Sequence, residues 1–216
     1  MSWILKDGHA NLGLGDWFVS ASLGGKRPKL EIQTKLGYSN KQILTMDVGP
    51  IDSNHENQLP WLPFGDAYVR QNDLIAIYPE KYPWQFGYQI DIRTSQPDDR
   101  KILCMEIWLS VQTSLLDSHP QLSIQIADEY FAPLSKDIWT NLSKKVAIAI
   151  HPFDRADCHV ECTTNDFNMK IFGRFMEKGV IRRMRFRCIA AIDSQSNNFW
   201  EDQLNKFSNS PMPLTT

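Results

Sequence analysis

The residues with the clearest chemical potential lie near the C-terminal end of the chain, in three segments that alternate apolar and charged side chains. These segments are residues 157–163, 168–175 and 182–188. Alternate side chains of a β-strand point to opposite faces, so three adjacent antiparallel strands would gather the charged ones on one face. The candidate ligand-binding residues of this face are His159, Glu161, Lys170, Arg174, Arg183, Arg185 and Arg187.

This predicted face is basic. Together with Asp157 it carries five basic side chains and two acidic ones, a local excess of three positive charges. Arginine presents a planar fork of donors that suits carboxylate or phosphate groups. Like charges directly opposite each other destabilise a sheet, so the arginines favour an acidic neighbour or ligand. We therefore predict a non-enzymatic binding module for an anionic small molecule or an acidic protein surface.

Two other interpretations of the same face stay open. It can be an ordinary solvated face with cross-strand ion pairs, each worth at most about 1 kcal/mol, which is the commoner arrangement. It can also belong to an enzyme acting on an anionic substrate, with His159 as general base, Glu161 orienting it and an arginine holding the anion. A concave pocket containing His159 would favour the enzyme.

A metal site is suggested by the histidines and cysteines between His151 and Cys162. Strand geometry argues against it, because the four residues from Cys158 to Cys162 span about 13 Å, too far for two ligands of one zinc. His159 would also point to the opposite face from both cysteines. We expect no metal, no cofactor, and four reduced, buried cysteines: Cys104, Cys158, Cys162 and Cys188.

Aromatic residues and prolines cluster in the middle of the chain, beside a segment from Gly49 to Phe64 that is predicted to be a long loop. Such a cluster can form a platform for sugar rings, which makes a carbohydrate-contacting module a third interpretation. The alternative is a secondary core beneath the loop, where aromatic residues usually lie. The aromatic residues are Trp61, Phe64, Tyr78, Tyr82, Trp84, Phe86 and Tyr88.

Other functional signatures are missing from the sequence. The glycine-rich segment from Gly8 to Asp16 lacks the lysine of a phosphate-binding loop and is predicted to be a turn. We find no nucleophile elbow, kinase motif or dinucleotide fingerprint. Nucleic acid is not an expected partner, because the net charge is −2 and the strand predicted at Met169 lacks an RNA-recognition signature.

Five turn signals separate segments that are typical of β-strands, and each predicts a hairpin. Opposed residues share a face, so a correct register should place apolar residues opposite apolar ones. The turn signals are Gly24-Gly25, Asn72-Asp73, Pro97-Asp98-Asp99, Asn165-Asp166 and Lys178-Gly179. The predicted opposed pairs include Val19 with Leu30, Ile92 with Leu103, Glu161 with Lys170, Asp157 with Arg174, and Ile171 with Phe186.

Two short helices are predicted beside these hairpins. Ser135 can cap one that carries Ile138, Trp139 and Leu142, and Ser196 can cap another that carries Trp200, Leu204 and Phe207. At 216 residues, with 42% hydrophobic residues, the composition is that of an ordinary globular chain.

We therefore predict a mostly β fold. It is a single antiparallel β-sandwich or curved sheet built of hairpins, with one or two covering helices. Residues 1–207 form one domain and residues 208–216 a flexible tail. The N-terminus lacks the features of a signal peptide, and no apolar run is long enough to span a membrane. A cytoplasmic protein without a membrane partner is expected.

Overall fold

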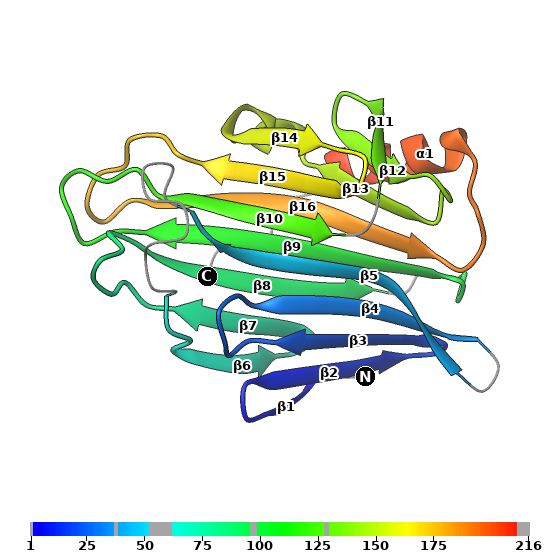
Figure 1. Cartoon of the computed structure of the whole chain (residues 1–216), viewed down its shortest axis with the longest axis horizontal. Coiled ribbons are helices and arrows are strands. Elements are labelled where there is room, and N and C mark those ends of the chain that lie inside the picture. The colour runs from blue at the N-terminus through cyan, green and yellow to red at the C-terminus, as the bar shows by residue number, and fades with distance from the viewer. Residues whose placement is uncertain (1, 37–38, 52–61, 96–98, 128–129, 211–216) are drawn as a thin grey trace.

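A computed structural model describes residues 2–36, 39–51, 62–95, 99–127 and 130–210. These residues form two eight-stranded antiparallel sheets packed face to face, which confirms the predicted β-sandwich (Figure 1). Sheet A contains, in spatial order, β1 (Ile4–Lys6), β2 (His9–Leu14), β3 (Trp17–Ser22), β4 (Lys29–Leu36), β5 (Ser39–Pro50), β10 (Gln121–Ala127), β15 (Asp166–Phe172) and β14 (Cys158–Cys162). Sheet B contains β11 (Phe131–Ser135), β12 (Ile138–Asn141), β13 (Val146–Ile150), β16 (Ile181–Ala191), β9 (Ile102–Gln112), β8 (Gly87–Ser95), β7 (Asp73–Tyr78) and β6 (Asp66–Arg70).

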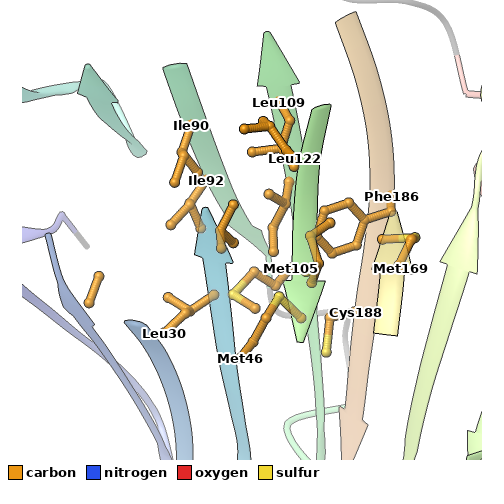
Figure 2. Packing of buried hydrophobic residues seen from close by; sticks show 14 of the residues in the cluster. Leu30, Met46, Ile90, Ile92, Met105, Leu109, Leu122, Met169, Phe186 and Cys188 are labelled. Atoms are coloured by element: carbon orange, nitrogen blue, oxygen red, sulfur yellow. The ribbon is translucent and has the colours of Figure 1, made fainter. Parts of the chain in front are cut away.

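The core lies between the two sheets and follows from the alternation of apolar residues. In β3, Trp17, Val19 and Ala21 are buried, whereas the residues between them are exposed or half-buried. Figure 2 shows side chains from β4, β5, β10 and β15 pointing toward those from β8, β9 and β16. Each strand therefore has an inner apolar face, and its other face is left to carry function or a covering helix.

Three of the predicted hairpins have the correct faces but the wrong register. Val19 pairs with Ile32 rather than Leu30, and Ile92 pairs with Ile107 rather than Leu103. Glu161 pairs with Asn168 rather than Lys170. The register shifts are by even numbers of residues. An even shift leaves every side chain on its face, so the apolar pattern cannot detect it.

The hairpin predicted at Asn72-Asp73 also has the expected faces, with Val69 opposite Leu74. Its turn lies one residue earlier, because Arg70 pairs with Asp73 and Gln71 adopts a positive φ of 57°. β7 is buried on both faces, as predicted, whereas its partner β6 is half exposed because it lies at the edge of sheet B.

The hairpin predicted at Lys178-Gly179 is wrong. β15 pairs with β10 and β14 in sheet A, whereas β16 pairs with β13 and β9 in sheet B. The connecting residues 173–180 cross from one layer of the sandwich to the other. Two strands that face each other across a core bury the same alternating residues as two strands in a hairpin, so the sequence pattern fits both arrangements.

One of the two predicted helices is confirmed. α1 (Asn197–Ser208) begins after Ser196, whose hydroxyl accepts a hydrogen bond from the Phe199 N–H at 3.2 Å. Its Trp200 and Phe207 are fully buried. The helix predicted after Ser135 is wrong.

That segment is instead the hairpin of β11 and β12, because β12 continues the sheet beside β13. A short 3-10 helix, η1 (Pro152–Asp157), joins β13 to β14. No helix among the described residues is long and apolar enough to cross a membrane.

Three smaller predictions concern loops and the tail. The segment from Gly8 to Asp16 is strand β2 with a turn at each end, rather than one turn. In the segment predicted as a long loop, Gly49 and Pro50 belong to β5, and residues 52–61 lie outside the described residues. In the predicted tail, α1 ends at Ser208, and residues 211–216 lie outside the described part of the chain.

Candidate functional site

The sandwich divides the predicted basic face between its two outer surfaces. The residues of β14 and β15 lie on the outer side of sheet A, and the three arginines of β16 lie on the outer side of sheet B. The predicted seven-residue site therefore does not form. His159, Glu161 and Lys170 are on sheet A, and Arg174 follows β15 and binds Asp157 beside that sheet. Arg183, Arg185 and Arg187 are on sheet B.

The sheet A group is a set of exposed ion pairs. Glu161 Oε1 lies 3.3 Å from both Lys170 Nζ and His159 Nε2, and Arg174 Nε lies 2.8 Å from Asp157 Oδ1. The contacts of Glu161 with Lys170 and of Asp157 with Arg174 thus form despite the different register. The His159 side chain is 72% exposed. The enzyme interpretation placed His159 and Glu161 beside arginines. The structure separates them from Arg183, Arg185 and Arg187, which lie on sheet B, whereas Arg174 binds Asp157 at the start of β14.

The outer face of sheet B consists of an apolar half and a polar half. α1 covers the apolar half, where Trp200 and Phe207 pack on small and aliphatic side chains of the sheet. Figure 1 shows α1 at one end of the sandwich, away from the loops that follow β7 and β9 at the other end. The polar half is not covered by α1, and we call it the open face. Its central residues are Gln89, Asp91, Trp108, Ser110 and Arg183.

Strand register brings the open-face residues together in rows. Ser110 pairs with Gln89 on one side and Arg183 on the other. Trp108, one row along, pairs with Asp91 and Arg185. Directly paired residues of an antiparallel sheet share a face with their Cβ atoms about 5 Å apart, so each row forms a continuous strip of side chains.

Two adjoining hollows lie along the open face and have Gln112 and Ile181 in common. The larger, of about 480 Å³, is also lined by Glu80, Thr113, Ser114 and Gly179. The smaller, of about 70 Å³, is also lined by Ile77, Tyr88, Gln89, Ser110 and Arg183. The hollows follow β9 to its C-terminal end.

Asp91 and Arg183 give the open face two groups of opposite charge. The Asp91 carboxylate accepts a hydrogen bond of 2.6 Å from Gln89 Nε2. Burial raises the pKa of Asp91, although this hydrogen bond and the charge of Arg183 act in the opposite direction. Arg183 is exposed, and its guanidinium has no hydrogen bond or ion pair with any described residue. The pair therefore offers acceptors and donors to a ligand.

Trp108 is held in place from two sides. Its indole Nε1 donates to Glu106 Oε1 at 2.9 Å, and the Arg187 guanidinium binds the other oxygen of Glu106, also at 2.9 Å. The Arg185 guanidinium lies 5.3 Å from the centre of the indole ring. The ring remains partly exposed in this position, so the open face contains an aromatic surface of fixed orientation.

Arg185 belongs to the support of this site and not to its surface. It is only 2% exposed and lies 2.6 Å from His151 Nε2 through its Nη2. Its backbone N–H donates to Asp154 Oδ2 at 3.0 Å, and its Nη1 is buried without a hydrogen-bond partner among the described residues. The side chain of this predicted ligand-binding residue is therefore buried beneath the open face, where it contacts Trp108 and His151.

The pKa values around Arg185 reflect the same burial. Burial, followed by the charge of Arg185, lowers the pKa of His151, and burial also lowers the pKa of Arg185. Burial raises the pKa of Asp154, which the hydrogen bond from Arg185 partly offsets. Burial and the neighbouring guanidinium thus favour the neutral form of His151, which packs against Phe207 of α1.

The other candidate residues are mostly structural. Tyr78, Trp84, Phe86 and Tyr88 are buried, and Tyr82 is 93% exposed. The aromatic cluster is thus a core, and Trp61 lies outside the described residues. The four cysteines are free, with Cys162 exposed rather than buried as predicted. Within the described ranges no group of three histidine, cysteine or acidic side chains is placed to hold a metal.

Sequence reasoning missed Trp108, Ser110 and Asp91 as site residues. The signal was present in the β8–β9 hairpin, where Gln89 and Asp91 alternate with apolar residues of the inner face. Shifting the predicted register of this hairpin by four residues places Trp108 opposite Asp91. Of the predicted set, Arg183 alone reaches the open face with an exposed side chain, while Arg187 supports Trp108 through Glu106.

Comparison with known proteins gives a likeness of fold. No protein-family model matches the chain, and no curated protein is similar to it in sequence. Among solved structures, it resembles one described as "Putative kojibiose phosphorylase from human microbiome", with a TM-score of 0.52 and 11% sequence identity. The likeness covers 93% of this chain and 33% of that protein, so this chain spans about a third of its length.

Proposed function

We propose that this chain is a carbohydrate-binding module and that the open face of sheet B is its ligand site. The observation that carries the proposal is the partly exposed Trp108 in a row with Asp91, next to the row of Gln89, Ser110 and Arg183. An indole ring packs against the apolar C–H face of a sugar, and polar side chains around it bind the hydroxyl groups.

The fixed position of Trp108 favours this function. The bonds through Glu106 and the contact with Arg185 hold the ring before a ligand arrives. A site that is already ordered loses less conformational entropy on binding. The solved structure whose fold this chain resembles is described as "Putative kojibiose phosphorylase from human microbiome". That name supports sugars as the ligand class to test first.

The test is isothermal titration calorimetry with glucose, maltose, cellobiose and kojibiose. The unmodified protein should bind at least one of them. Trp108→Ala should weaken that binding at least tenfold, about 1.4 kcal/mol, and Trp108→Phe should restore part of it. Tyr82→Ala, which removes an exposed aromatic ring elsewhere, is the control and should bind normally.

Two results would overturn the proposal. One is failure of every sugar to bind at millimolar concentration. The other is equal affinity in Trp108→Ala, once its thermal stability shows that the variant is folded.

A second candidate function is the binding of an anion, as expected from the sequence. Its support is Arg183, an exposed guanidinium without a bonded partner among the described residues. Inorganic phosphate and glucuronate are the probes, and Arg183→Gln should abolish their binding. The affinity for these anions should decrease as salt is added, because salt screens the charge of Arg183. The affinity for neutral sugars should not change.

A further inference from the structure

We infer that the ligand is an oligosaccharide of at least two sugar units that lies along β9, from Trp108 to the hollow around Gln112. This inference rests on the proposed function, because it extends the same site. It adds a second subsite with its own residues and determines which sugars the module should prefer.

The length of the site is the first argument. Trp108, Ser110 and Gln112 are alternate residues of β9 and therefore point to the same side of sheet B. Gln112 lies four positions after Trp108, a distance of about 13 Å along the strand. One hexose ring is shorter than this, so a monosaccharide on Trp108 leaves Gln112 without a contact.

The second argument is that the hollows adjoin. Gln112 and Ile181 line both of them, and Ser110 and Arg183 line the one nearer Trp108. Ile181 pairs directly with Gln112, so the two side chains stand side by side where the hollows meet. A chain of sugar units that starts at Trp108 therefore reaches the larger hollow along the surface of the sheet.

The side chains of the larger hollow suit a sugar. Ile181 is 54% exposed and offers an aliphatic surface to a sugar ring. Gln112 is exposed, and its side-chain amide has no hydrogen bond among the described residues. The amide carries both a donor and an acceptor for adjacent hydroxyl groups.

The neighbouring polar groups are already engaged within the protein. Thr113 Oγ1 donates to the Gln85 carbonyl at 2.7 Å, and the Ser114 hydroxyl donates to Glu80 Oε1 at 2.6 Å. These hydrogen bonds shape the hollow, and the side-chain amide of Gln112 is the polar group most available to bind a ligand there.

The charge of the larger hollow indicates a neutral second unit. Glu80 is the one charged side chain among its lining residues. A carboxylate repels an acidic sugar or a phosphate and accepts hydrogen bonds from hydroxyl groups. Any anionic group of the ligand therefore belongs outside the larger hollow, in the middle row beside Arg183.

The experiment compares glucose with kojibiose, maltose, cellobiose and maltotriose by calorimetry, using the unmodified protein and Gln112→Ala. At least one longer sugar should bind more tightly than glucose. Gln112→Ala should weaken binding of that sugar about three- to tenfold, as expected for one or two lost hydrogen bonds, and leave glucose binding unchanged. Gln33→Ala, a glutamine on the outer face of sheet A, is the matched control.

Ile181→Ala provides a second, independent test, because this exposed residue stands beside Gln112 and lines both hollows. It too should weaken the longer sugar and leave glucose unaffected. If glucose and the longer sugars bind equally, or if both variants leave the longer sugar unaffected, the second subsite is refuted while sugar binding stands. If no sugar binds the unmodified protein, the proposed function itself fails.

Discussion

The ion pair between Arg187 and Glu106 supports Trp108, and its removal should destabilise the fold far more than removal of a surface pair. The two side chains are only 16% and 15% exposed and lie 2.9 Å apart. Lys101 and Asp193 also lie 2.9 Å apart, but their side chains are 63% and 61% exposed. The two pairs match in distance and differ in burial.

Glu106→Ala leaves the mostly buried guanidinium of Arg187 and the indole N–H of Trp108 without their acceptor. Breaking a buried pair by removing one partner typically costs about 3 to 5 kcal/mol. In a chain of this size each 1 kcal/mol lowers the melting temperature by about 2 to 4 °C, so a decrease of about 6 to 20 °C is expected. Asp193→Ala should leave the melting temperature unchanged, because water solvates the lysine that remains.

Urea denaturation measures the free energy of unfolding of both variants. An m-value equal to that of the unmodified protein would show that unfolding exposes the same amount of surface in each. The double variant Glu106→Ala with Arg187→Ala should lose less free energy of unfolding than the sum of the single variants, since it leaves no unpaired charge. Equal losses in Glu106→Ala and Asp193→Ala would refute the argument, because burial would then not decide the cost.

Two further predictions concern buried titratable groups. Burial and Arg185 lower the pKa of His151 below 6.5, so below pH 6.5 the unfolded chain binds a proton that the folded chain does not. The free energy of unfolding should therefore fall as pH decreases from 6.5 to the folded-state pKa, and His151→Gln should remove this part of the pH dependence in urea titrations between pH 8 and 5. Burial raises the pKa of Cys104 to about 11 and that of Cys158 to about 12, and Cys188 is also buried. A thiol reagent at pH 8.5 should thus modify the exposed Cys162 rapidly and the other three cysteines slowly. Rapid labelling that persists in Cys162→Ser would contradict the burial of those three.

The faces of the strands were predictable from the sequence because the pleat of a strand has a period of two residues. The alternation in β3 and β8 identified their inner residues correctly. Ser196 and the spacing of Trp200 and Phe207 identified α1 and its buried side in the same way, because a helix also repeats over a few residues. These signals are local and need no knowledge of the rest of the chain.

The candidate site was only partly predictable. Arg183 was selected for its charge, and the structure places it at an accessible hollow. Asp91 was placed on the outer face of its hairpin, but the register was four residues in error, and this error hid its pairing with Trp108. The turn signal Pro97-Asp98-Asp99 predicts a hairpin between β8 and β9, but such a signal does not determine the length of the loop.

The sequence by itself determined which side chains of each strand face the core and where the last helix begins. The tertiary structure decided which strands are neighbours, and this separated His159 and Lys170 from Arg183. Strands β15 and β16 bury the same alternate residues whether they pair in one sheet or face each other across the sandwich. The burial of a residue depends on the face of the strand that it occupies, whereas the composition of a site depends on which strands are neighbours. Only the packing of the whole chain determines which strands are neighbours.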